Sequence, residues 1–243
     1  MRTTGVKYKP ERFHYLDSAE DIQSAFIVFK SAGVKSIEDV KNKQLLMGST
    51  GKGSQTYILP TLANTLLGTK FKVIAGYRGM DGIYLALDRG EVQGFQAVYS
   101  SPKPLRPHWF EQNKLVILAA NALTPIADQP NVPLLKDMVT DPMDKKILEL
   151  IGGNGTLGRG WLAPPGVPRA RVAALRAAYK MALNDPSVAA AAGKRKMTYG
   201  PVTWQAMLAH AKNRCGRRCA VRSCAQAAVS KVSLRNFPSP SFG

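Results

Sequence analysis

The stretch that decides the fold spans residues 44–66 and reads QLLMGSTGKGSQTYILPTLANTL. Residues 44–47 form an apolar run typical of a short strand, and residues 48–54 form a loop of glycine and hydroxyl side chains. The following helix is expected to bury one face, formed by Ile58, Leu62 and Leu66. Pro60 has no amide N–H, so it predicts an irregular or delayed first turn. A strand, a loop and a helix in this order predict one unit of an α/β fold.

Strand and helix patterns alternate on both sides of this stretch. Residues 24–29, SAFIVF, are typical of a strand that is buried on both faces. Ser36 is placed to cap a helix whose first turn carries two carboxylates. Further strands are expected at residues 71–75, 95–98 and 115–119, and further helices at 82–88 and 105–111. The alternation predicts an α/β sheet with parallel neighbouring strands.

The pattern changes to Pro-rich connections and helices after residue 121. Helices are expected at residues 134–139, 143–151, 169–184, 188–193 and 204–211, with a short strand at 160–163. The longest helix is expected to bury one stripe, formed by Val172, Leu175, Tyr179 and Leu183.

The charge is unevenly distributed along the chain. The net charge is +18, but the last acidic residue is Asp185, and ten basic residues follow it. The first 185 residues therefore carry only +8, and the last segment has the composition of an unstructured basic tail. All three cysteines, Cys215, Cys219 and Cys224, lie in this tail. Together with His210 they offer the residue types of a zinc site, but their spacing is not that of a familiar zinc finger.

Residues 48–54 resemble a phosphate-binding loop but do not match it. A phosphate loop needs Ser or Thr directly after Gly-Lys, whereas here Gly53 follows Lys52. Two interpretations remain: an ordinary tight turn, or a loop that holds a small anion at a helix N-terminus. Arg78 follows another strand and offers a fork of donors for a carboxylate, although a solvated or capping role is equally compatible.

The sequence gives little indication of catalysis or of a bound cofactor. Its three histidines, His14, His108 and His210, are far apart, and it contains no Gly-x-Ser-x-Gly nucleophile elbow. Metal-binding spacings of His or Cys are absent as well. The run of glycines at residues 153–158 follows a helix and precedes a strand, the reverse of a dinucleotide fingerprint. We therefore expect a protein that is not an enzyme and uses no cofactor or metal.

Four stretches in order resemble one known family. They are KSIEDV at residues 35–40, MGSTGKGS at 47–54, YRG at 77–79 with LALDRGEVQG at 85–94, and VP at 132–133 with GWLAPPGVP at 160–168. Their order and spacing resemble the periplasmic substrate-binding receptors of tripartite tricarboxylate transporters, the Bug family. The resemblance extends from about residue 12 to residue 211.

The resemblance implies a two-lobed Venus flytrap of α/β lobes, the periplasmic-binding-protein-like fold, which closes over a small organic carboxylate. The protein would be a periplasmic monomer that delivers a di- or tricarboxylate to the membrane components of the transporter. The ligand-binding residues implied are Ser49, Thr50, Gly51, Gly53 and Ser54, with Tyr77 and Arg78 as further cleft residues.

This chain departs from the family at both ends. The export signal and the strand, loop and helix that open the family's layout are not in this sequence. We therefore expect an N-terminally truncated receptor with one incomplete lobe, which is cytoplasmic if expressed as written. Many relatives have an Asp at residue 96, where this chain has Gln, which argues against amine-bearing ligands. The expected segments are lobe 1 at residues 1–32, lobe 2 at 33–118, a return to lobe 1 at 119–211, and a tail at 212–243.

An alternative interpretation gives the protein a different class of partner. Residues 194–235 carry most of the unbalanced basic charge, and such a region can bind nucleic acid or an anionic membrane surface. The tail has only two aromatic residues, Phe237 and Phe242, for stacking on bases, so nucleic acid is the less favoured partner.

Overall fold

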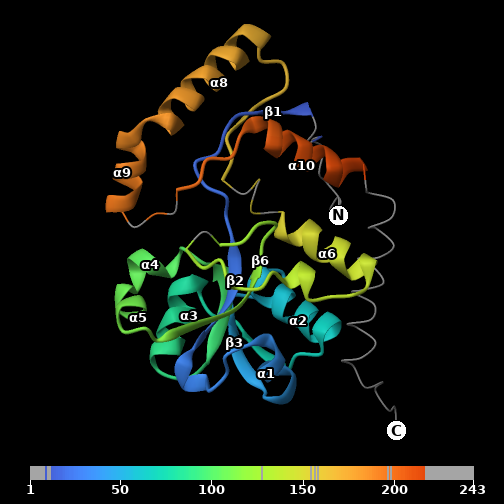
Figure 1. The fold of residues 1–243 in the computed structure, drawn as a ribbon, viewed down its shortest axis with the longest axis vertical. Helices are drawn as coiled ribbons and strands as arrows, with labels where there is room; N and C mark the ends of the chain where they lie inside the picture. The colour runs from blue at the N-terminus through green and yellow to red at the C-terminus, as the bar shows by residue number, and fades with distance from the viewer. Residues whose placement is uncertain are drawn as a thin grey trace.

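A computed structural model describes residues 9, 12–126, 128–153, 155, 157, 159–195, 197 and 199–216. The larger part of the molecule is built on a five-stranded sheet with the order β4-β3-β5-β2-β6 (Figure 1). Its strands are β2 (Ser24–Phe29), β3 (Leu45–Ser49), β4 (Phe71–Ala75), β5 (Gly94–Val98) and β6 (Leu115–Asn121). All five strands were expected from the sequence, within two residues at each end.

The direction of the strands corrects one expectation. β3 pairs with β4 and β5 in parallel, as predicted, but β2 is antiparallel to both of its neighbours, β5 and β6. The sheet is therefore mixed. The first five residues of β2 are buried, as expected, because β2 lies inside the sheet and both of its faces are covered. A buried apolar run has the same composition in either direction, so it carries no information about orientation.

Helices cover both faces of this sheet (Figure 1). Cluster A, on one face, joins β2 and β3 to the helices α1 (Ile37–Asn42), α2 (Gln55–Leu67) and α6 (Pro142–Gly152). Cluster B, on the other face, joins β2 and β5 to α3 (Gly79–Asp88) and α5 (Pro107–Glu111), with α4 (Pro102–Leu105) beside them. The two faces together make this part a three-layered α/β lobe.

Two helices, α1 and α2, begin where the local sequence indicates. Ser36 caps α1 as predicted: its hydroxyl accepts from the amide of Asp39, whose carboxylate accepts from the amide of Ser36. α2 begins at Gln55 despite Pro60, which lies within the helix and is buried. The expected face of α2 is partly wrong, since Ile58 is 42% exposed whereas Leu59 and Leu62 are buried.

The smaller part of the molecule has much less sheet. β1 (His14–Tyr15) and β7 (Leu162–Ala163) form a two-stranded antiparallel sheet, against which α10 (Trp204–Gly216) packs. Tyr15, Met207 and Ala211 are its buried core. The described residues thus form one complete lobe and a second, incomplete one.

The helices α8 (Arg169–Asn184) and α9 (Pro186–Lys194) extend from this smaller part (Figure 1). Asp185 ends α8 as predicted, but the expected buried stripe is only partly right. Val172 is buried and Tyr179 and Leu183 are half-buried, whereas Leu175 is 40% exposed. In the described residues, the ring of Trp161 packs on this stripe, 5.8 Å from the ring of Tyr179. The helix expected at residues 134–139 is only a single 3₁₀ turn, η3 (Leu135–Asp137), like η2 (Lys30–Ala32) after β2.

The five-stranded sheet includes β2 and the last residues of β6, so it extends beyond the boundaries expected at residues 32 and 119. Most of the basic tail, with Cys219 and Cys224, lies outside the described residues. None of the described helices has the length and apolar character needed to cross a bilayer.

Candidate functional site

Three parallel strands end at the same edge of the five-stranded sheet. β4, β3 and β5 lie side by side in one direction, so residues 50–54, 76–78 and 99–101 leave the sheet at neighbouring points. β2 enters at this edge, since Ser24 pairs with Val98. The chain reaches β2 from β1, so the edge faces the smaller part of the molecule (Figure 1). Ligands of open α/β sheets bind at the carboxyl ends of such strands.

The loop after β3 is held in shape by hydroxyl groups. Ser49 is fully buried, and its Oγ accepts from the amide of Gly51 at 3.2 Å. The same oxygen lies 2.9 Å from Oγ1 of Thr56, which also accepts from the amide of Thr50 at 3.1 Å and contacts the hydroxyl of Ser54. Thr56 therefore joins three residues of the loop to the first turn of α2. Sequence reasoning missed Thr56, although a hydroxyl residue two positions after such a loop was a usable signal.

The N-terminus of α2 is left without a compensating side chain. Ser54 is the residue before the helix, but its hydroxyl donates to the carbonyl of Gly51 at 2.9 Å instead of capping the helix. The first turn contains no acidic residue. A Cβ placed on Gly51 or Gly53 would meet no atom within 4 Å, so the loop backbone borders open space. An uncompensated helix N-terminus beside open space favours an anion.

The loop after β4 is hydrogen-bonded to the end of β3, next to the loop at residues 49–54. The amides of Gly76 and Tyr77 donate to the carbonyl of Ser49 at 3.1 and 3.2 Å. Burial, and secondly the negative charge of Glu91, raise the pKa of the Tyr77 phenol, which stays protonated. Arg78 is exposed at the start of α3, and no ion pair between described residues includes it. The structure thus brings Tyr77 next to the loop and leaves the Arg78 guanidinium available.

A cavity of about 350 Å³ opens at the same edge, between the two parts of the molecule. It is lined by residues of the larger part and by Arg159 and Met197 of the smaller part. Residues of the predicted loop, 49–54, do not line it. The lining residues are Glu20, Met80, Tyr84, Ser100, Ser101, Pro104, Leu105, Arg159 and Met197.

An ion pair between a buried carboxylate and an exposed guanidinium lines this cavity. The Glu20 side chain is only 7% exposed, and its carboxylate pairs with Nη1 of Arg159 and accepts from the hydroxyl of Ser100 at 3.1 Å. The hydroxyl of Ser18 donates to the backbone carbonyl of Glu20 at 3.0 Å. Sequence analysis did not identify Glu20 or Arg159, which are 139 positions apart and carry no local motif.

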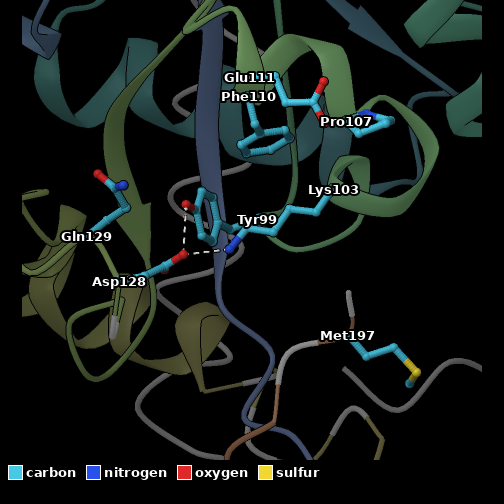
Figure 2. A pocket seen from close by; sticks show the side chains of 8 residues that line it. All are labelled: Tyr99, Lys103, Pro107, Phe110, Glu111, Asp128, Gln129 and Met197. Atoms are coloured by element: carbon cyan, nitrogen blue, oxygen red, sulfur yellow. Dashed lines mark hydrogen bonds and ion pairs between the residues drawn. The ribbon is translucent and has the colours of Figure 1, made fainter. Parts of the chain in front are cut away.

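A second cavity, of about 510 Å³, lies beside α4 and α5 (Figure 2). Asp128 accepts from the hydroxyl of Tyr99 at 3.2 Å and pairs with Lys103 at 2.5 Å. Burial, together with the charge of Asp128, raises the pKa of Tyr99 to about 12. The carboxylate and the ammonium in this cavity thus satisfy each other.

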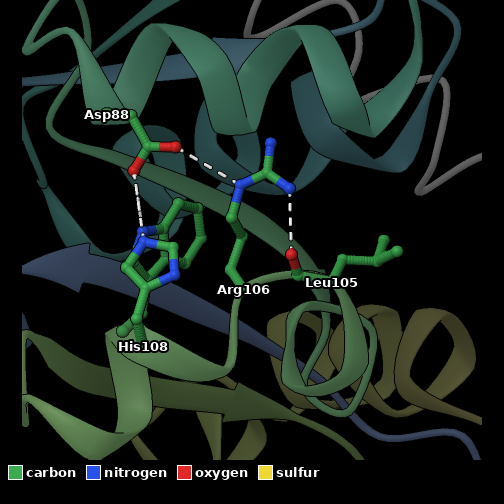
Figure 3. A network of polar contacts seen from close by, with 5 residues as sticks. Asp88, Leu105, Arg106 and His108 are labelled. Carbon is green, nitrogen blue, oxygen red and sulfur yellow. Dashed lines mark hydrogen bonds and ion pairs between the residues drawn. The ribbon is translucent and has the colours of Figure 1, made fainter.

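The wall of that cavity is fixed by Asp88 at the end of α3 (Figure 3). Its carboxylate accepts from the indole N–H of Trp109 at 2.8 Å and from Nε of Arg106 at 3.3 Å. Nε2 of His108 lies 3.9 Å from the same carboxylate. His108 therefore belongs to a network that anchors α5, with Trp109 fully buried beneath it.

The side chains and amides at this edge of the sheet are mainly hydrogen-bond donors. In the described ranges, no group of three His, Cys, Asp or Glu side chains could hold a metal ion. Cys219 and Cys224, two of the zinc ligands considered above, lie outside these ranges. What the edge of the sheet offers is backbone amides, hydroxyls and guanidinium groups, which are donors suited to a carboxylate.

No family model matches the chain, and no curated protein matches it by sequence. Several solved structures match the chain in their fold. A TctC solute-binding protein from Polaromonas, without ligand, has a TM-score of 0.63 at 19% identity, covering 95% of this chain and 71% of that one. R. palustris Rpa4515 with adipate has a TM-score of 0.59 at 19% identity, and the match covers 96% of this chain and 72% of that one. MatC from Rhodopseudomonas palustris with bound malate has a TM-score of 0.55 at 18% identity, and the match covers 88% of this chain and 71% of that one.

These likenesses extend over both parts of the molecule and agree with the resemblance stated from the sequence motifs. At this level of identity they establish the architecture. The chain has the fold of the periplasmic solute-binding proteins of the TctC type.

Proposed function

We propose that this protein is a solute-binding receptor that captures a small organic acid, a di- or tricarboxylate, for a tripartite tricarboxylate transporter. The observation that carries the proposal is the uncompensated N-terminus of α2 beside the open backbone of Gly51 and Gly53. Two structures of the same fold hold adipate and malate, which supports a carboxylate as the ligand.

The roles of the loop residues follow from their contacts. Ser49 is buried and fixes the loop from within, while Thr50 and Ser54 are partly exposed beside it. Gly51 and Gly53 let the anion approach the backbone, and Tyr77 and Arg78 flank it. No bond of the ligand is made or broken, so the protein acts as a receptor and not as an enzyme. Closure of the two parts would exclude bulk water and strengthen these contacts.

Two further statements belong to the same proposal. A receptor of this kind works in the periplasm, where it meets both the free acid and the membrane components of the transporter. It works as a monomer, because one chain supplies both sides of the cleft.

Calorimetric titration of the full chain with mono-, di- and tricarboxylates tests the proposal. Gly51→Asp is the informative variant: the added side chain enters open space, and a carboxylate near a helix N-terminus stabilises the helix. The variant should fold at least as well as the parent but lose the acid by charge repulsion. Gly51→Ala adds the Cβ without the charge, so it is the matched steric control and should weaken binding much less than Gly51→Asp does. Unchanged binding by Gly51→Asp would exclude this loop as the site, and a parent that binds no acid would contradict the function.

The basic surface supports a second candidate function. α8 and α9 carry the exposed basic residues Arg169, Arg171, Lys180 and Lys194 between few acidic ones, and residues 194–235 continue this charge. Such a surface could bind nucleic acid or an anionic membrane. Phosphate contacts weaken steeply with added salt, whereas a carboxylate held in a cleft responds mildly. Titrations at two salt concentrations separate the two functions.

A further inference from the structure

The inference concerns the outer side of α8, and it rests on the second candidate function, the basic surface. We propose that this side of α8, together with Trp161, docks on an anionic lipid bilayer. The apolar side chains enter the membrane–water interface, and the neighbouring cations contact the lipid phosphates. A receptor that rests on the bilayer would stay beside the membrane components to which it delivers its ligand.

The exposed side of α8 is mostly apolar. Met181 is 76% exposed, and it lies with four exposed alanines on the side of the helix opposite the buried Val172. A surface helix ordinarily presents charged and polar side chains there. The four alanines are Ala170, Ala174, Ala177 and Ala178. This side of α8 therefore suits an apolar or half-apolar environment better than water.

Trp161 extends the apolar side of α8 into a larger surface. Its ring lies 5.8 Å from the ring of Tyr179, yet 59% of the residue is exposed. Leu175, which is 40% exposed, lies one turn before Tyr179, and Ala178 connects Leu175 to Met181 at helical spacings of three residues. We call Trp161, Leu175, Ala178 and Met181 the docking face. Tryptophan is enriched at membrane–water interfaces because its ring is apolar and its N–H is polar.

The charges beside the docking face are all positive. Arg169, Arg171 and Lys180 are exposed on α8, and the sequence has no acidic residue between Glu149 and Asp185. The carboxylate of Asp185 caps α9, where it accepts from a backbone amide at 2.8 Å. Long basic side chains can lay their stems along apolar surface while their charged ends reach phosphates. Apolar residues flanked by Lys and Arg are the composition of helices that lie on anionic membranes.

The apolar residues decide between a bilayer and the other possible partners. Nucleic acid would pair with the cations, but its phosphates offer nothing to Leu175 and Met181. A second copy of this chain would bring the same positive charge to the contact and be repelled. A bilayer interface accommodates the apolar and the basic side chains together, so it fits the docking face best. Figure 1 shows α8 at an outer edge of the smaller part, away from the five-stranded sheet.

Co-sedimentation of the full chain with lipid vesicles tests the proposal. The parent should bind vesicles of phosphatidylcholine mixed with phosphatidylglycerol, and not vesicles of phosphatidylcholine alone. Trp161 is the one exposed tryptophan, so binding should also shift the Trp emission to shorter wavelength. Added salt should weaken the binding, because it screens the charges on both surfaces.

Single substitutions assign the binding to α8. Arg171→Gln should weaken binding to the anionic vesicles about fivefold, the effect of one cation beside such a surface. Met181→Gln should weaken it at least about fivefold, because an apolar side chain is lost from the interface. Lys72→Gln on β4 and Leu85→Gln on α3 are the matched controls, since both residues are exposed on the larger part. They should bind as the parent does.

The outcomes separate this inference from the functions proposed above. A chain that binds duplex DNA but no vesicles would overturn this inference alone, and a chain that binds neither would overturn the basic surface as well. Vesicle binding that Arg171→Gln and Met181→Gln leave unchanged would overturn the assignment to α8. Dimers that Met181→Gln abolishes, without vesicle binding, would assign the docking face to a second copy. Calorimetry with malate reports on the carboxylate site separately, and both variants should keep the affinity of the parent.

Discussion

The hydroxyl of Ser49 lies 2.9 Å from the hydroxyl of Thr56, and this contact joins the end of β3 to the first turn of α2. Ser49 itself is fully buried. Buried hydroxyl groups therefore hold the loop of the candidate site in shape, while the loop backbone at Gly51 and Gly53 borders open space.

Thr56→Val should loosen this loop. The variant keeps the shape of the side chain but leaves the amide of Thr50 without its partner and removes one of the contacts of the buried Ser49 hydroxyl. We expect a loss of about 1–3 kcal/mol in the free energy of unfolding, with weaker carboxylate binding, measured by denaturant titration and calorimetry. Thr61→Val on the same helix is the control, since its hydroxyl donates only to the carbonyl of Tyr57. Equal effects of the two variants would contradict the role of Thr56.

Gly94→Ala should destabilise the five-stranded sheet. A Cβ at Gly94 would lie 2.6 Å from Cγ1 of Val28 and 2.8 Å from the carbonyl oxygen of Ile27, and backbone in β2 cannot move aside. We expect a loss of about 1–3 kcal/mol or more on urea unfolding. Gly193→Ala is the control: its Cβ meets nothing within 4 Å, and alanine favours the helix α9 by up to about 1 kcal/mol. A neutral Gly94→Ala would mean that β2 and β5 lie farther apart.

Gln96→Met should stabilise the protein. Gln96 is 1% exposed in β5, and neither polar atom of its side chain has a hydrogen-bond partner in the described residues. Methionine has a similar volume and no amide to bury, so we expect a gain of about 1–3 kcal/mol in chemical denaturation. A loss of stability would show that the amide has a partner that the variant removes.

The pH dependence of stability should include a contribution from Asp39. Its carboxylate accepts from the amides of Lys35 and Ser36, and these bonds lower its pKa below the ordinary 3.8. Since the folded pKa is the lower one, the contribution is present above the unfolded pKa and is lost as the pH falls through the folded value. Asp39→Asn should be less stable than the parent near neutral pH, with a gap that narrows below about pH 4. Unfolding curves that stay parallel across this range would contradict the assignment.

The buried and the exposed face of α8 should respond differently to substitution. Val172→Ala removes two buried methyl groups and should lower the free energy of unfolding by about 2 kcal/mol. Met181→Gln changes a side chain that is 76% exposed, and its effect should stay within about 0.5 kcal/mol. Similar losses at both positions would mean that a partner covers Met181 in solution.

Much of the larger lobe was predictable because its signals are local. Ser36 and Asp39 form a capping box within four residues, and the run at residues 24–29 has the composition of a fully buried strand. The loop at residues 48–54 was recognisable for the same reason, as glycine and hydroxyl residues stand between a strand and a helix. Each of these signals depends on neighbours in the sequence.

The remainder depends on contacts between distant residues. The antiparallel direction of β2 depends on pairing with strands some 70 and 90 residues away in the chain, which the composition of β2 does not encode. Glu20 and Arg159 meet only in the folded molecule, and no motif surrounds either of them. The exposure of Leu175 on α8 was mispredicted because periodicity shows which face is apolar and not whether another element covers each position on it.

A thermal melt of the full chain, followed by Trp fluorescence with and without dicarboxylates, tests the central claim most directly. Trp109 is fully buried in the larger lobe and reports its unfolding. Adipate or malate at about a hundred times Kd should stabilise the native state by about 2.7 kcal/mol and raise Tm by several degrees. A cooperative transition that no organic acid shifts, even at millimolar concentration, would contradict the account of this protein as a carboxylate receptor.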